Sequence, residues 1–355
     1  MRYETKDGGF KSFGEFLVTA RKVRDGELKD SRLISAEIGK TAGHMAIGED
    51  SQGGFLVPEQ YVSEVLHAAL EDAIVRPRAK VFPATSDSLK IPRLVETDRS
   101  SNYFGGITFR WLYEAAQKSY STKITKPSVG QLELTVHKAI GSCWVSNELE
   151  SDAMAFGEFM RVSFGQAIRF EEDYQFIWGS GVGQPLGAAH ASNGSRIAVP
   201  RLQANAIIYA DVLQMTERLL PGCWGSSSTV WLANPDTVTH LMELDSAETD
   251  VVNIIDINDR KMFGFPVIFT EKAAPLGTAG DLILADFAHY AIADREMVIA
   301  GSRHVERSNV GFTTDESYWK VQLRVDGQPT LTNAITPKRG VNTLSPFVVL
   351  SDFVS

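Results

Sequence analysis

Two segments with matching strand patterns, separated by a long intervening stretch, constrain the fold more than any other feature. Leu89 and Ile91 alternate with polar neighbours in DSLKIPRLV, and Leu132 and Leu134 do the same in QLELTVHKAI. This alternation predicts two half-buried strands that pair with each other. The stretch between them, residues 92–130, is far longer than an ordinary hairpin loop. Because a two-stranded excursion is marginal in water, we expect contacts from outside the hairpin to support it.

The intervening stretch carries aromatic side chains that need a surface to cover them. Its lysines, interleaved with these rings, could contact nucleic acid, but Asp98 and Glu114 dilute the positive charge and no RNA-binding motif follows. A contact with another protein is therefore the favoured interpretation. The candidate subunit-interface residues are Tyr103, Phe104, Phe109, Trp111, Tyr113 and Tyr120.

The longest predicted helix covers residues 151–178. Ser151 or Asp152 can cap its start, and Gly179 can end it. At ~1.5 Å per residue, such a helix spans roughly 40 Å. Its apolar residues recur every three or four positions, and those expected on the buried face are Phe156, Met160, Phe164, Ala167, Phe170, Tyr174 and Ile177.

Residues 1–54 are polar and glycine-rich. They contain one convincing helical pattern, in which Phe13, Phe16, Leu17 and Ala20 lie at helical spacing. We expect little of this segment to form a core alone. Order is expected to begin at GGFLVPEQYVSEVL.

Residues 209–295 predict a compact α/β unit of alternating helices and strands. Helices are predicted over DVLQMTERLL and NPDTVTHLMEL, the second with Asn234 as its cap and Pro235 in its first turn. Strands are predicted over STVWLA, PVIFT, DLILADF and HYAIAD, and then over EMVIAG, SYWKVQLRVDGQP and PFVVL towards the C-terminus. In SYWKVQLRVDGQP, Trp319 and Val321 alternate with polar residues, which predicts one buried face.

The glycine run FIWGSGVGQPLG raises the question of a phosphate-binding loop. Its glycines follow a helix, their spacing fails the dinucleotide and P-loop patterns, and the run contains no lysine. Ser180 lacks the turn of a hydrolase nucleophile, because Trp178 stands where GxSxG needs its first glycine. We interpret the run as a hinge-like connector without a ligand of its own. The candidate hinge residues are Gly179, Gly181 and Gly183.

The sequence offers no catalytic or metal-binding pattern. The histidines are scattered without HExxH or metal-ligand spacing, and Cys143 and Cys223 lie outside any CxxC motif. Neighbouring Glu171, Glu172 and Asp173 on the long helix point to different faces, which does not suit a paired acid and base. We therefore predict a protein that is not an enzyme and has no catalytic residues, cofactor or metal.

The overall composition limits which classes of protein remain possible. The 355 residues, 43% of them hydrophobic, can bury a sizeable core. A formal net charge of −9 disfavours a protein that wraps nucleic acid electrostatically. Two cysteines suit a reducing cytoplasm, and we find neither a signal peptide nor an apolar run long enough to span a membrane.

The order of these segments resembles that of the major capsid proteins of tailed bacteriophages, the Hong Kong 97-like family. GGFLVPEQYVSEVL resembles the leading segment of that family. SDSLKIPRL and QLELTVHKAIGSCWVSNELE resemble the two stems of its extended loop and the lead into its spine helix. EEDYQFIWGSGVGQPLG is similar to the end of the spine helix and the turn beyond it, and MFGFPVIFT and RVDGQP resemble later segments. The resemblance runs from about residue 53 to the C-terminus.

The resemblance implies an α+β fold with four parts. These are an N-terminal arm, 1–57; an extended β-hairpin loop, 86–138; a peripheral domain with the spine helix 151–178, over 58–85, 139–186 and 296–336; and an α/β axial domain, 187–295 and 337–355.

The resemblance also implies a function. The expected protein is a major head protein that self-assembles into hexameric and pentameric capsomers of an icosahedral shell around double-stranded DNA. It would be a virion component assembled in the host cytoplasm. Its expected partners are further copies of itself, a scaffold protein, a portal and a decoration protein. Packaged DNA is expected to lie close to it without sequence-specific contacts, and no membrane partner is expected. Because only residues 1–52 precede GGFLVP, either a separate scaffold protein assists or a scaffolding segment has been removed.

Two other functions stay open. An encapsulin-type bacterial nanocompartment shell shares the fold and packages a cargo enzyme, although the long segment before GGFLVP favours the viral protein. A nucleotide-binding enzyme that uses the glycines of residues 179–187 is the more distant alternative.

Overall fold

The chain divides into two compact units in the computed structural model. The structure describes residues 8–26, 28–33, 55–56, 61, 73–94, 98–99, 103–104, 107–108, 129–146, 150, 153–247, 255–256, 260–302 and 316–353. Unit 1 comprises Met1–Ala73, Val136–Glu172 and Asp294–Val325, and unit 2 comprises Ile74–Thr135, Asp173–Ala293 and Asp326–Ser355. No helix among the described residues has both the length and the apolar character needed to cross a membrane.

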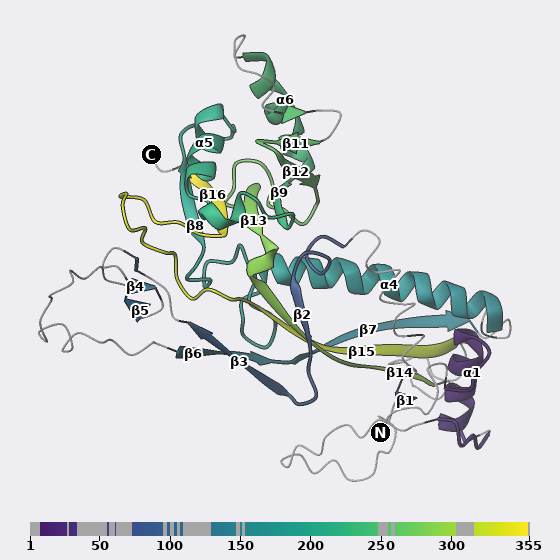
Figure 1. The fold of residues 1–355 in the computed structure, drawn as a ribbon. Coiled ribbons are helices and arrows are strands. Elements are labelled where there is room, and N and C mark those ends of the chain that lie inside the picture. Colours follow the sequence, from purple (N-terminus) through teal and green to yellow (C-terminus); the bar gives the residue numbers. More distant parts are fainter. Residues whose placement is uncertain are drawn as a thin grey trace, which may run out of the picture. The chain divides into compact units, whose positions relative to one another are not determined.

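Unit 1 is built on a sheet with the strand order β1-β14-β15-β7 (Figure 1). Its strands are β1 (Phe55–Leu56), β7 (His137–Ser146), β14 (Tyr290–Ser302) and β15 (Glu316–Pro329). Strands β7 and β15 pair antiparallel over ten positions, from Glu316↔Ser146 to Val325↔His137. The predicted buried face of β15 is confirmed, because Trp319 and Val321 are buried.

The predicted long helix is confirmed as α4 (Ala153–Trp178), which packs on this sheet. The rings of Phe156 and Trp319 lie 5.1 Å apart. Gly301 makes room for the indole, since a Cβ there would lie 2.7 Å from Trp319. The predicted caps Ser151 and Asp152 lie outside the described residues.

The buried face of α4 differs from the predicted one towards its C-terminus. Phe156, Met160 and Phe164 are buried, but Phe170 is 46% exposed and Tyr174 is 44% exposed. In the last turn the predicted Ile177 is buried, and Phe176, which was not predicted, is buried as well, with its ring 5.7 Å from that of Tyr290. The helix therefore changes its buried face where its packing partner changes, which a single helical period does not predict.

The N-terminal helix α1 (Phe13–Arg24) belongs to the core of unit 1. Phe16 and Leu17 are fully buried. A Cβ at Gly157 of α4 would lie 2.6 Å from the backbone nitrogen of Gly14, so two glycines allow the two helices to touch. This does not contradict the expectation that little of residues 1–54 forms a core alone, because α1 is buried against residues outside that segment, such as Tyr61 and Gly157. The partners that bury it lie far away in the sequence.

Unit 2 contains a seven-stranded sheet with the order β10-β11-β12-β9-β13-β16-β8. In sequence order the strands are β8 (Ile197–Arg201), β9 (Thr229–Ala233), β10 (Ile255–Asp256), β11 (Lys261–Met262), β12 (Phe265–Phe269), β13 (Leu282–Asp286) and β16 (Phe347–Phe353). Strand β9 runs parallel to β12 and antiparallel to β13, and β16 runs parallel to β8. Its core includes Trp231, Leu284 and Val348.

The two predicted helices of this unit are confirmed as α5 (Tyr209–Glu217) and α6 (Val238–Ala247). The Asn234 side chain accepts a hydrogen bond from the Asp236 amide, and Pro235 begins the 3₁₀ turn η4 (Pro235–Thr237) before α6. Strand β8 was not predicted. The separate strands predicted over HYAIAD and EMVIAG form the single strand β14.

The predicted hairpin stem is present. Strands β3 (Ser88–Leu94) and β6 (Val129–Thr135) pair antiparallel along their full length, from Ser88↔Thr135 to Leu94↔Val129. Leu132 and Leu134 are buried and Glu133 is exposed, as the alternation predicts. Within the intervening stretch, β4 (Tyr103–Phe104) pairs with β5 (Ile107–Thr108) (Figure 1). Strand β2 (Lys80–Pro83) precedes the stem and pairs with β14.

Candidate assembly site

The root of the hairpin is fixed to the last residues of β15 and to Thr330, which follows that strand. The Thr135 amide at the end of β6 donates to Asp326 Oδ2 at 2.8 Å. The Gln328 side chain donates to the Glu133 carbonyl at 3.1 Å. On the other strand, Arg93 Nη1 donates to the carbonyl of Thr330 at 3.1 Å. Both strands of the stem are thus attached to residues 326–330 of the same unit.

Asp326 is the acidic group at this root. Its side chain is buried, and burial raises the pKa of its carboxyl to about 6. Hydrogen bonds from Gly327, Thr135 and Gln328 favour the carboxylate and oppose that shift. The pKa of Tyr290 is raised by burial and by the charge of Asp326. The hydrogen bond that ends β6 therefore depends on a carboxyl that titrates not far below neutral pH.

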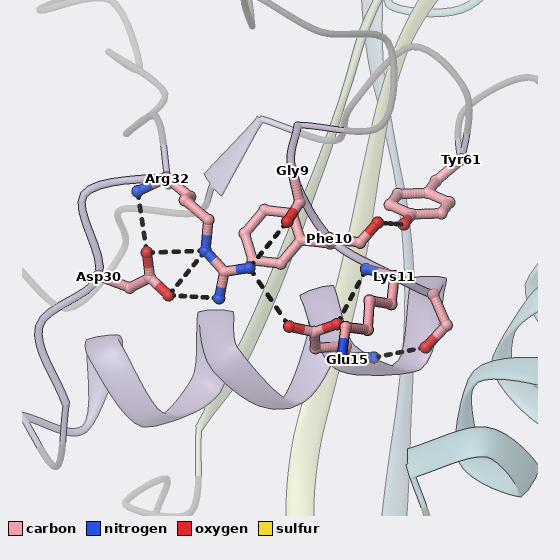
Figure 2. Close-up of polar contacts among 8 residues, drawn as sticks. Gly9, Phe10, Lys11, Glu15, Asp30, Arg32 and Tyr61 are labelled. Carbon is pink, nitrogen blue, oxygen red and sulfur yellow. Dashed lines mark hydrogen bonds and ion pairs between the residues drawn. The ribbon is translucent and has the colours of Figure 1, made fainter.

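The N-terminal segment is closed by a cluster around Arg32, shown in Figure 2. Arg32 Nη1 donates to the Gly9 carbonyl at 2.8 Å and lies 3.3 Å from Glu15 Oε1. Its Nη2 donates to Asp30 Oδ2 at 2.7 Å. The guanidinium carbon stands 4.3 Å from the centre of the Phe10 ring, a cation–π distance. Hydrogen bonds from Arg32 lower the pKa of the Asp30 carboxyl.

The start of α1 is held within the same cluster. The Ser12 hydroxyl accepts from the Glu15 amide at 3.2 Å, and the Glu15 carboxylate accepts from the Lys11 amide at 2.9 Å. The Tyr61 hydroxyl donates to the Phe10 carbonyl at 2.8 Å (Figure 2). The Ser12 bond satisfies an amide that a helix start leaves unpaired, and the bonds of Lys11 and Phe10 fix the chain just before α1.

A buried ion pair anchors the other end of α1. Arg21 Nε contacts Glu150 Oε1, and both side chains are almost fully buried. Glu150 Oε2 accepts a hydrogen bond from the Ser317 hydroxyl of β15 at 2.5 Å. The N-terminal helix is therefore held within unit 1 at its start by the Tyr61 hydrogen bond and the Arg32 cluster, and at its end by a desolvated charge pair.

The glycine run forms a closed turn after α4. The Gly179 amide donates to Gln175 O at 2.8 Å, that of Gly181 to Pro185 O at 3.1 Å, and that of Gly187 to Gly179 O at 2.8 Å. Gly181 has φ +79°, in the region that favours glycine. Gly179 is not in that region. It is needed because a Cβ there would lie 2.2 Å from the Pro185 carbonyl oxygen.

These amides donate to the protein's own carbonyls, which is the opposite of a loop that presents its amides to a phosphate. Gly183, the third candidate hinge residue, has φ +69° and open space around a hypothetical Cβ. That the turn acts as a hinge stays a prediction.

Of the six candidate interface aromatics, Tyr103 and Phe104 lie in β4. Phe109, Trp111, Tyr113 and Tyr120 lie outside the described residues. Asp326 and Arg21 were not predicted from the sequence. Neither residue belongs to a sequence motif. The role of each depends on a partner distant in the chain, Thr135 for Asp326 and Glu150 for Arg21.

The model of the phage capsid family matches residues 53–339. The chain belongs to the phage capsid family. It is thus a capsid shell protein, and its α+β fold is of the Hong Kong 97-like type. No curated protein sequence matches the chain significantly.

Solved capsid structures share the fold of this phage capsid family member at low sequence identity. The capsid of an empty GTA particle, computed with C5 symmetry, is 15% identical, with a TM-score of 0.56, over 79% of this chain and 90% of that one. A chain from Mycobacterium phage Adephagia is 14% identical, with a TM-score of 0.54, over 80% and 91%. A chain from Mycobacterium phage Cain is 16% identical, with a TM-score of 0.54, over 80% and 91%. The suspected family and fold class are confirmed.

Proposed function

We propose that this capsid protein is the repeating subunit of an icosahedral phage head, assembling with itself into hexamers and pentamers around double-stranded DNA. The observation that carries the proposal is the hairpin. Its seven-residue strands β3 and β6 are fixed at the root by Asp326, Gln328 and Arg93, and they lead into a stretch rich in aromatic side chains. A rigid root allows the far end of the hairpin to reach a neighbouring subunit in a defined direction.

The energetic argument favours many modest contacts. A fully buried aromatic side chain stabilises a contact by about 2–3 kcal/mol before ordering losses. Several of the six aromatics therefore suffice for a subunit contact that forms reversibly and closes a shell by repetition. Like-charged subunits oppose this, but exposed charges more than about 8 Å apart are screened at physiological salt.

The remaining parts take the roles that the family resemblance implies. Residues 1–57 act as the N-terminal arm, with α1 as its anchored part, and Gly179, Gly181 and Gly183 connect the spine helix to the axial domain. Further partners are a scaffold protein, a portal and a decoration protein, with assembly in the host cytoplasm. The protein acts structurally, without a catalytic site. The C5 symmetry of the solved GTA capsid fits the pentameric vertices proposed here.

The test is assembly of the full chain, alone and with its scaffold protein, followed by analytical ultracentrifugation and negative-stain microscopy. We expect closed particles with five-fold and six-fold capsomers. Trp111→Ala should reduce particle yield while leaving the subunit's circular dichroism and thermal unfolding unchanged, and Trp111→Phe, which keeps an aromatic ring, should assemble normally.

Three results would contradict the proposal. A persistent monomer at high concentration would remove the shell function, and normal particle yield from Trp111→Ala would remove the hairpin from the interface. Particles that exclude DNA but capture a cargo enzyme would instead identify a compartment shell.

A further inference from the structure

Three side chains able to bind a metal meet in unit 2. Cys223 ends the 3₁₀ turn η3 (Pro221–Cys223), Asp286 ends β13, and His289 ends the 3₁₀ turn η5 (Phe287–His289). One potential ligand atom from each of the three lies within 4.8 Å of the other two. Cys223 and Asp286 are buried, and His289 is half-buried. The sequence does not reveal this group, because the cysteine is far from the other two residues and follows no motif.

The backbone holds the three residues on a fixed frame. Asp286 is opposite Thr229 in the ladder of β13 with β9. The Thr229 hydroxyl donates to the Cys223 carbonyl at 2.7 Å. The His289 carbonyl accepts two hydrogen bonds from Thr330, one from its amide at 2.8 Å and one from its hydroxyl at 2.9 Å. These bonds position the turns without using the ligand atoms themselves.

The carboxylate is oriented by its own partners. Asp286 Oδ1 accepts from the Ser226 hydroxyl at 3.1 Å and from the Ala288 amide at 3.0 Å. Hydrogen bonds of this kind orient a carboxylate ligand, and removing them weakens metal affinity about 10- to 100-fold at known metal sites.

We propose that Cys223, Asp286 and His289 bind a divalent cation, with zinc as the expected ion. Thiolate, carboxylate and imidazole are ligand types of zinc, and the two anionic ligands balance its charge in a buried position. Zinc–ligand bonds of about 2.0–2.3 Å place tetrahedral ligands about 3.5 Å apart, so ligand atoms now up to 4.8 Å apart approach each other by up to about 1.3 Å around the ion. Water takes the fourth position from the exposed side of His289. The Cys223 proton leaves to solvent on binding.

The competing role for Cys223 is a local hydrogen bond. Burial raises the pKa of its thiol, the charge of Asp286 adds to the shift, and the thiol lies within hydrogen-bonding reach of that carboxylate. Burial also lowers the pKa of His289, with Lys80 adding to the shift and Asp286 opposing it. In this role Cys223 is a neutral donor. The two roles differ in one observable, since only a metal site contains a metal-bound thiolate.

The experiment titrates Co²⁺, a spectroscopic substitute for zinc, into the full-length protein without a histidine tag, after chelator treatment in a phosphine reductant. We expect one Co²⁺ per chain, a thiolate-to-cobalt charge-transfer band in the near ultraviolet, and loss of the band when Zn²⁺ displaces the cobalt. Zn²⁺ should also raise the thermal unfolding temperature of the wild-type chain.

Four variants locate the site. Cys223→Ser should abolish the band, His289→Gln should weaken binding at least about tenfold, and Ser226→Ala should weaken it about tenfold while keeping the band. Cys143→Ser is the matched control and should behave as wild type, because Cys143 is the other free cysteine and lies in β7. Because Cys223 is buried, Cys223→Ser can prevent folding. In that case the proposal is tested by the cobalt spectra of the wild type and of Ser226→Ala. Absence of the band in wild type, or its loss in Cys143→Ser, would overturn the proposal.

Discussion

Replacing Asp326 by asparagine tests whether a buried, titrating carboxyl holds the hairpin root. Its pKa is raised from 3.8 to about 6, a difference of about two units, which corresponds to about 3 kcal/mol. Because the folded pKa lies above the unfolded one, the native state binds more protons between these values. The stability contributed by this group is therefore present at low pH and is lost as the pH rises from about 4 to about 6.

Asparagine removes the titration but changes one hydrogen bond. It keeps an acceptor oxygen for the Thr135 amide, and places an amide nitrogen where the second carboxylate oxygen accepts from Gly327. A donor facing a donor costs about 1–2 kcal/mol at every pH. We therefore expect Asp326→Asn to be less stable than wild type near pH 4 and at least as stable above about pH 7. The difference between the two proteins should change by about 3 kcal/mol across this range.

Urea unfolding of both proteins over this pH range measures the difference, and hydrogen exchange at the Thr135 amide reports on the root itself. Asp236→Asn, at an exposed carboxylate in unit 2, controls for the loss of one charge. Parallel pH profiles for wild type and Asp326→Asn would refute the reasoning, because they would mean that Asp326 titrates alike in the folded and unfolded chain.

Two further predictions concern α1. Arg21→Met should destabilise unit 1 by about 3–5 kcal/mol in thermal or urea unfolding, because Glu150 then stays buried without its guanidinium partner. Adding Glu150→Gln should recover most of the lost stability, and a double variant with no recovery would argue against the ion pair. Gly157→Ala should cost about 1–3 kcal/mol and speed proteolysis of residues 8–33, since the new Cβ would press on the Gly14 backbone. Gly225→Ala, which has open space around its Cβ, is the control, and equal effects of the two glycine variants would contradict the packing argument.

The features that sequence analysis predicts correctly are those with local periodicity. The stem strands β3 and β6 follow from alternation around Leu89 and Leu134, and the length of α4 follows from its helical spacing and the glycine after Trp178. The start of α6 follows from Asn234 and Pro235, whose cap chemistry is complete within four residues. The partial misassignment of the buried face of α4 has the opposite cause, because exposure of Phe170 depends on what lies against the helix.

In the amino-acid sequence, the order of segments was enough to suggest the family, through its resemblance to phage capsid proteins. Hydrophobic periodicity and turn chemistry predicted most helices and strands, because they act over a few residues, but they missed β8 and divided β14. Only the tertiary structure decided that α1 is anchored by Arg21 and by the contact of Gly14 with Gly157, that Asp326 holds the hairpin root, and that Cys223 meets His289. Each of these is a contact between residues far apart in the chain. Its energy comes from burial and charge that exist only once the chain has closed on itself.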